Sequence, residues 1–329
     1  LELKDDTYPV IAGQTISSNY PITPDAFDRK YGGYCGFVTG FESDLSNITF
    51  STLFGNATWI YDIEIGSDDG IYITGRTQDI KGKFHISPNA FDSRFEGGEE
   101  GFVSKLSHNV SELIYSSYMG RTENADGLPH FTYEERCTDL EVSTEGRVYV
   151  VGHTDAPNLY VTKGAFDKIR AERDGFFAVV SPDGETLEYC TYLGGNDEDS
   201  ITDIALNSSR WLYIGGLTYY NYINHDFPVT ENAYDDTFNG GYDAFVTSFK
   251  GDSFISDPPS NVIVETGDGY ANLSWDPPLF DGYEIITGYN IHQGFTSNPQ
   301  NTHKIASGIT SMYLNVTGLE NGYRYFFFI

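Results

Sequence analysis

A three-residue phrase, alanine followed by an aromatic residue and aspartate, occurs four times in this chain, at intervals of 64 to 75 residues. In each copy a phenylalanine follows the aromatic residue at a distance of ten or eleven positions. A unit that recurs in this way predicts stacked supersecondary modules and not one unique core. The four copies are Ala26-Phe27-Asp28, Ala90-Phe91-Asp92, Ala165-Phe166-Asp167 and Ala233-Tyr234-Asp235.

Each copy also carries a run of β-branched and aromatic residues that ends in glycine, one variable residue and threonine. Such a run predicts a buried strand. Three copies have a short alternating strand and a turn before it, which is a hairpin signal, and three have a further strand after the phenylalanine. Four short antiparallel strands per unit are typical of a propeller blade. The Gly-Thr strands cover residues 10–15, 72–77, 149–154 and 213–218.

These phrases, in this order, resemble the β-propeller repeat family of secreted and surface proteins that is sometimes named for its seven-bladed members. Two segments match that repeat almost letter for letter, Asp226-Phe227-Pro228-Val229-Thr230 and Asp243-Ala244-Phe245-Val246. The match covers about residues 8–250 and implies an all-β fold with β-propeller repeats in residues 1–256. Because members of the family are mostly surface modules, the resemblance implies a surface protein and names no ligand.

The four repeats do not make a complete set. The first enters at its Gly-Thr strand without the strand that precedes it elsewhere, and the fourth stops near Phe249 without its last strand. Closed propellers usually have four to eight blades, which leaves three interpretations. The chain is a small ring sealed by Leu1-Glu2-Leu3, the last part of a larger ring, or a partial propeller completed by another chain. We favour the larger ring.

A second domain is expected at residues 257–329, after the stiff junction Asp257-Pro258-Pro259-Ser260. Its short strands resemble a fibronectin type III domain, an immunoglobulin-like sandwich, with Trp275 as the core tryptophan and Tyr325 in the tyrosine-corner position. The last strand of the family pattern is missing. An aromatic strand edge is therefore expected to be exposed as an interaction surface, comprising Tyr323, Tyr325, Phe327 and Ile329.

The charge of the chain limits its partners. With 48 acidic against 19 basic residues the net charge is -29, so a nucleic-acid partner is excluded for lack of a basic surface. No apolar run approaches the ~18 residues of a membrane span. A start at Leu1 fits a cleaved signal peptide or a fragment. These features favour an extracellular or cell-surface location.

Six Asn-x-Ser/Thr sequons support that location, because they predict N-linked glycans on the exterior. They lie at Asn47, Asn56, Asn109, Asn207, Asn272 and Asn315. The three cysteines show no metal-ligand spacing. Cys35 stands where other repeats have an acid, and a disulfide between Cys137 and Cys190 is one open alternative.

The sequence predicts no catalytic centre, because its seven histidines are scattered without a paired nucleophile. The aspartate of each repeated phrase is interpreted as a turn residue. Calcium is the cofactor with sequence support, since two loops collect the oxygen ligands that it prefers. The candidate ligands are Asp197, Glu198 and Asp199 in one loop and Asp68 and Asp69 in the other.

Three classes of function compete. The leading hypothesis is a non-enzymatic structural or adhesive surface protein, a glycosylated filament or sheath subunit joined to other copies or to surface proteins and glycans by β-strand addition. The alternative is a lectin-like propeller that binds carbohydrate or protein through Tyr219, Tyr220, Tyr222 and Trp211. The third is a polysaccharide hydrolase or lyase, which requires two carboxylates in the central funnel of the propeller.

Overall fold

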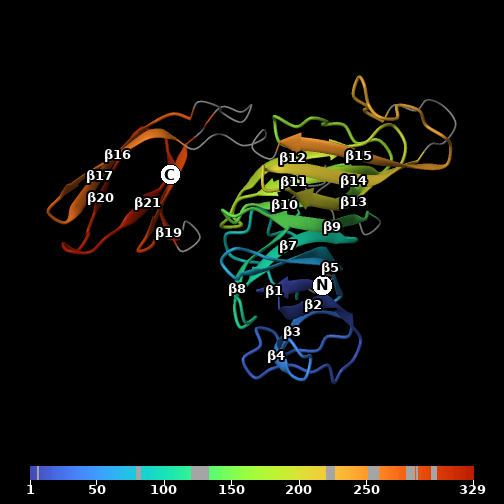
Figure 1. The fold of residues 1–329 in the computed structure, drawn as a ribbon, viewed down its shortest axis with the longest axis horizontal. Coiled ribbons are helices and arrows are strands. Elements are labelled where there is room, and N and C mark those ends of the chain that lie inside the picture. The colour runs from blue at the N-terminus through green and yellow to red at the C-terminus, as the bar shows by residue number, and fades with distance from the viewer. Residues whose placement is uncertain are drawn as a thin grey trace. The chain divides into compact units, whose positions relative to one another are not determined.

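The computed structural model shows an all-β chain made of small sheets (Figure 1). It divides into two compact units, Leu1–Phe249 and Lys250–Ile329, and each is considered by itself. The junction expected at 257–260 lies largely outside the described residues. The structure describes residues 1–5, 7–78, 83–119, 133–219, 227–250, 259–278, 286, 288–297 and 302–329.

The first unit consists of four sheets, and within each of them every strand pairs with the next one along the chain. The first sheet contains β1 (Glu2–Lys4), β2 (Tyr8–Thr15), β3 (Cys35–Phe41) and β4 (Ile48–Phe54). The second contains β5 (Thr58–Ile65), β6 (Ile71–Thr77), β7 (Glu100–Leu106) and β8 (Leu113–Tyr118). The third contains β9 (Glu135–Val142), β10 (Val148–Thr154), β11 (Asp174–Val180) and β12 (Leu187–Leu193). The fourth contains β13 (Asp199–Leu206), β14 (Trp211–Tyr219) and β15 (Tyr242–Lys250).

The four sheets stack in chain order, as the progression from blue to orange in Figure 1 shows. Their first strands are neighbours, with β1 against β5, β5 against β9 and β9 against β13. One apolar core lies between the first and second sheets and includes Val38 and Phe102. Another lies between the second and third sheets and includes Val103 and Phe176. The structure establishes a stack of small antiparallel sheets. It does not show the expected propeller.

The repeated aspartate has the turn role that the sequence predicts. In every copy its Oδ1 accepts a hydrogen bond from the backbone N–H two residues later, an Asx turn. In the first sheet the Asp28 N–H also donates to the Thr52 hydroxyl at 2.9 Å, which ties the turn to the last strand. The same bond recurs from Asp92 to Ser117 and from Asp167 to Thr191. The phrase therefore fixes the loop before the third strand of a sheet.

In the second, third and fourth sheets the glycine of the Gly-Thr strand is required by a bulge in the strand beside it. The register shifts between Ile60 and Asp62 in β5, and a Cβ on Gly75 would lie 2.0 Å from the Trp59 carbonyl oxygen. A Cβ on Gly152 would lie 1.9 Å from the Arg136 carbonyl oxygen. Such a close approach of two backbones leaves space for glycine and for no other residue.

The ends of the repeat set differ in part from the expectation. The first sheet does possess its first strand, because Glu2 to Lys4 pair with Val10 to Tyr8. Sequence reasoning missed it because three residues are too few to show periodicity. In the fourth sheet, as expected, the described residues provide three strands and no counterpart of β4, β8 or β12.

The described residues of the second unit form two three-stranded sheets around one core that includes Trp275 and Ile291. Trp275 is buried, as predicted, and the Tyr325 hydroxyl accepts a hydrogen bond from the Glu320 N–H at 3.0 Å, which confirms the tyrosine corner. One sheet contains β16 (Ser260–Gly267), β17 (Tyr270–Asp276) and β20 (Tyr313–Thr317). The other contains β19 (Thr302–Ile309), β18 (Tyr289–Gly294) and β21 (Phe326–Phe328).

Candidate functional site

An aspartate follows the bulge in the first strand of three sheets, and in two of them it reaches the next sheet. The Asp62 Oδ2 accepts a hydrogen bond from the Leu140 N–H at 3.3 Å, and the Asp139 Oδ2 accepts one from the Ile204 N–H at 2.8 Å. Asp203 holds the same position in β13. Each aspartate lies thirteen residues before the glycine of its Gly-Thr strand, a regularity in the sequence that would have identified all three.

These aspartates belong to a larger group, the inner acidic row, which consists of Glu2, Asp62, Glu64, Asp139, Glu141 and Asp203. Burial, followed by the charges of Glu2, Glu141 and Asp62, raises the pKa of Glu64 to about 8. Burial and the neighbouring Asp62 raise the pKa of Asp139 to about 9. Burial and neighbouring carboxyl groups disfavour ionisation, and Glu64 and Asp139 therefore retain their protons near neutral pH.

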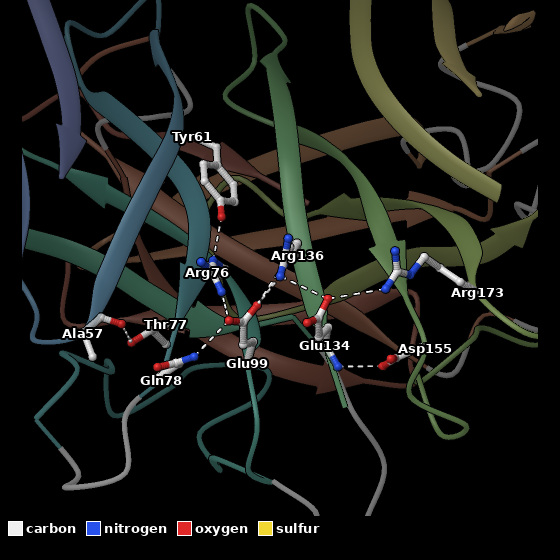
Figure 2. A network of polar contacts seen from close by, with 10 residues as sticks. All are labelled: Ala57, Tyr61, Arg76, Thr77, Gln78, Glu99, Glu134, Arg136, Asp155 and Arg173. Atoms are coloured by element: carbon white, nitrogen blue, oxygen red, sulfur yellow. Dashed lines mark hydrogen bonds and ion pairs between the residues drawn. The ribbon is translucent and has the colours of Figure 1, made fainter. Parts of the chain in front are cut away.

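A second polar group, the arginine–glutamate brace, joins the second and third sheets (Figure 2). It runs from Arg76 in β6 through Glu99, Arg136 and Glu134 to Arg173. The Arg136 Nη2 lies 2.8 Å from the Glu99 Oε2 and 3.0 Å from the Glu134 Oε2, and Arg76 is ion-paired with the same Glu99. Because Glu99 is buried, its charge depends on these two partners.

The surroundings of the brace hold it in place. The Arg76 Nε donates to the Tyr61 hydroxyl at 2.6 Å, and its guanidinium lies 4.2 Å from the centre of the Trp59 ring. His153 takes in β10 the position that Arg76 has in β6, and burial together with Arg173 and Arg136 lowers its pKa to about 4. His153 is therefore neutral near pH 7. The ion pairs of the brace connect the two sheets structurally.

The loop before each third strand is closed by a side chain at the first or second position of the strand. The Asp174 Oδ2 accepts a hydrogen bond from the Ala171 N–H at 3.0 Å, and Asp243 accepts one from Asn239. Cys35 does the same in the first sheet, where its sulfur accepts the Gly32 N–H at 3.3 Å. Cys35 thus replaces the acid of the other repeats in position and in role.

The loops proposed for calcium do not form one ligand cluster. Lys105 lies 2.6 Å from the Asp68 Oδ2 and neutralises it. Asp199 is buried and accepts the Gly195 N–H at 2.6 Å, while Glu198 is exposed. Across the described part of the chain no three histidine, cysteine or acidic side chains are placed to hold a metal ion. Calcium at Asp197 to Asp199, or at Asp68 and Asp69, therefore stays a prediction.

The sequons lie on connections between strands or on an outward face. Asn47, Asn109 and Asn207 are exposed in turns, and Asn56 is half-buried. In the second unit Asn272 and Asn315 are directly opposite each other on neighbouring strands, and their side chains are joined by a hydrogen bond of 2.5 Å. This pair faces outward, as expected, but two glycans cannot occupy the same place at once.

The three cysteines are free thiols, and all are buried. The disulfide considered between Cys137 and Cys190 is thus not formed, although both side chains belong to the core between the second and third sheets. Burial raises the pKa of both thiols, which keeps them protonated and unreactive.

The residues proposed for a lectin-like surface are only partly placed. Trp211 is partly exposed at the start of β14, and the ring of Tyr219 lies 4.6 Å from that of Tyr242. Tyr220 and Tyr222 lie outside the described residues. No helix long and apolar enough to cross a membrane is found in the portion of the chain that the structure describes.

Comparison with known proteins identifies one domain. Residues 257–329 match the family model described as fibronectin type III domain. The regulatory protein FlaEY of Caulobacter vibrioides is 23% identical over 240 residues, which are 72% of this chain and 22% of that protein. An amylopullulanase of Thermoanaerobacterium saccharolyticum is 29% identical over 143 residues, or 41% of this chain and 10% of that protein. The chain therefore spans less than a quarter of the length of either relative.

Three solved structures show weak similarity. The polysaccharide lyase Uly1 is 10% identical, the match covers 89% of this chain and 54% of that chain, and the TM-score is 0.29. A titin fragment of domains A168–A170 is 11% identical, with coverage of 96% of this chain and 92% of that chain and a TM-score of 0.21. The FN1–FN3 domains of chicken CNTN1 are 9% identical, with coverage of 83% of this chain and 91% of that chain and a TM-score of 0.20. None of these TM-scores establishes a shared fold for the whole chain.

Proposed function

Because residues 257–329 form a fibronectin type III domain, we propose that this chain is a non-enzymatic structural or adhesive module of an extracellular or cell surface. Fibronectin type III domains are typical of surface and extracellular proteins, and the strong negative charge and exposed sequons suit the same location. Its partners are other copies of the chain or surface proteins and glycans. The four sheets are consecutive blades of an incomplete β-propeller, which supplies a rigid platform.

The observation that carries this proposal is the edge strand β21. It pairs with β18 on one side through Phe326, Phe327 and Phe328, and no described strand pairs with its other side. Phe327 and Ile329 pack against the core of the domain, whereas Tyr323 is exposed. An open edge of aromatic residues is a template for a strand from another molecule.

Two proline variants test strand addition, because successive residues of a strand direct their N–H groups to opposite sides. Of Phe326→Pro and Phe327→Pro, one removes a donor from the bond with β18 and lowers the melting temperature of the domain. The other removes a donor from the open edge and reduces the amount of large species in sedimentation velocity, with the fold retained. A distribution of species that is unchanged from the wild type in both folded variants contradicts strand addition at β21.

A second function is favoured by one observation in the inner acidic row. Asp139 has a pKa of about 9 and hydrogen-bonds with Asp62, so it is protonated at neutral pH beside another carboxyl group. Glycoside cleavage uses a protonated acid and a second carboxylate about 5 to 9.5 Å away, so Asp139 would be the acid and a more distant member of the row, not Asp62, the second group. Release of reducing ends from polysaccharides by the wild-type chain, lost in Asp139→Asn, would support an enzyme. Absence of any release supports the structural module.

A further inference from the structure

The fourth sheet has an uncovered front face, where the front face of a sheet is the side that packs on the next sheet along the chain. Val246 in β15 is 79% exposed. Its counterparts Val38, Val103 and Phe177 are completely buried under the following sheet. Glycine–phenylalanine contacts fix this correspondence, because Phe245 lies against Gly216 just as Phe176 lies against Gly152.

The strand beside β15 shows the same contrast. Tyr213 in β14 is 43% exposed, whereas its counterparts Tyr72 and Tyr149 are buried. Tyr242 is also exposed. In the first sheet the carbonyl group of its counterpart Tyr34 accepts a hydrogen bond from the Ala57 N–H, which leads into the next sheet. In the third sheet the carbonyl group of its counterpart Arg173 accepts one from the Asp199 N–H in the same way. The fourth sheet thus presents both the apolar surface and the backbone acceptor of a sheet-to-sheet interface.

The first sheet presents the opposite half of such an interface on its rear face, the side that faces away from the second sheet. Leu3 in β1 is 45% exposed, and Ile11 and Phe37 are partly exposed. The counterparts of Ile11 and Phe37 in the second sheet are Ile73 and Phe102, and both are completely buried against the first sheet.

We propose that the front face of the fourth sheet docks on the rear face of the first sheet of a second copy of this chain. The new contact continues an interface that the molecule already forms three times between its own sheets. The two faces are different surfaces of one chain, so the contact is head-to-tail and either closes into a ring or propagates as a filament. It is distinct from strand addition at β21, since it uses the other unit.

Two charged variants test this docking by complementation. Val246→Asp blocks the front face and Leu3→Asp blocks the rear face, and each residue is exposed enough for the fold to tolerate the change. Ile169→Asp is the matched control, because Ile169 is 79% exposed and lies in the loop before β11. Circular dichroism melting first verifies that all three variants are folded.

Sedimentation velocity of the wild-type chain should show dimers or larger species, and more of them at high salt, since both partners carry the charge of -29. Each blocked variant should dissociate with a constant raised by about a hundredfold or more, while the control behaves as the wild type. An equimolar mixture of the two blocked variants should form dimers and nothing larger, because one intact pair of faces remains. The Phe326→Pro and Phe327→Pro variants should keep this association. A wild type that stays monomeric, or a mixture that fails to dimerise, overturns the docking.

Discussion

Asp174 is a completely buried acid whose replacement should stabilise the protein in a pH-dependent way. One oxygen accepts the Ala171 N–H, and the other has no hydrogen-bond partner among the described residues. Burial, with smaller effects from Asp199 and Asp167 that outweigh Arg170, raises the pKa of Asp174 from 3.8 to about 7. Asp174→Asn keeps an acceptor for Ala171 and removes the ionisable proton.

The raised pKa of Asp174 determines how the free energy of unfolding depends on pH. Below about pH 4 Asp174 is protonated in both the folded and the unfolded chain and does not lower the free energy of unfolding. Between about pH 4 and 7 the unfolded chain loses the proton while the folded chain keeps it, so the free energy of unfolding falls as pH rises. A difference of about three units is worth about 4 kcal/mol, of which about 2.5 kcal/mol is lost between pH 5 and pH 8.

Urea unfolding at pH 5 and pH 8 measures this effect. The gain of Asp174→Asn over the wild type should be larger at pH 8 than at pH 5 by about 2.5 kcal/mol. Asp25→Asn, at an exposed acid of the same unit, should show no such difference. If the gain of Asp174→Asn is equal at the two pH values, or if the variant is destabilised at both, the buried carboxylate is compensated and the reasoning fails.

Further expected outcomes concern the brace, the bulges, the thiols and the paired sequons. Glu99→Gln should lower the free energy of unfolding by about 3 kcal/mol, and Glu134→Gln, at the half-exposed end of the same brace, by less than about 1 kcal/mol, both measured in urea. Gly152→Ala should lower the free energy of unfolding by about 3 kcal/mol, because its Cβ would meet a carbonyl oxygen at 1.9 Å. Gly215→Ala, whose Cβ would have no atom closer than 4.0 Å, should lower it by less than about 1 kcal/mol. Equal melting temperatures of the two variants would contradict this difference. The three thiols should react with a disulfide reagent only after denaturation, and fast labelling of the native chain would show that the sheets open. In intact glycopeptides that span both paired sequons of the second unit, at most one should carry a glycan, and double occupancy would refute the steric conflict.

Features that arise within one repeat were predictable from the sequence. The Asx turn at Asp28, the Gly-Thr strands and the core position of Trp275 follow from local patterns. The structure confirms the turn, the tryptophan and all four strands, although only β6 and β10 are buried along almost their whole length. Local patterns succeed here because the physical cause, a turn or an alternating strand, lies within a few residues.

Features that join different repeats were not predictable in the same way. The brace pairs Glu99, just before β7, with Arg76 in β6 and Arg136 in β9, so its members come from separate segments of two sheets. The inner acidic row likewise forms only when first strands become neighbours, which stacking decides and no single segment encodes. The thirteen-residue spacing marks Asp62 and Asp139 as recurrent, but not as partners across two sheets.

The order of strands within the sheets has a mechanical consequence. Every sheet of the first unit is one uninterrupted stretch of chain, and the path leaves it only to begin the next. A tensile load applied through the two ends therefore peels one sheet at a time, and each event releases the slack of about 64 residues, or roughly 200 Å of contour length. A chain stretched in this way yields in discrete steps, and each step dissipates energy before the next sheet opens.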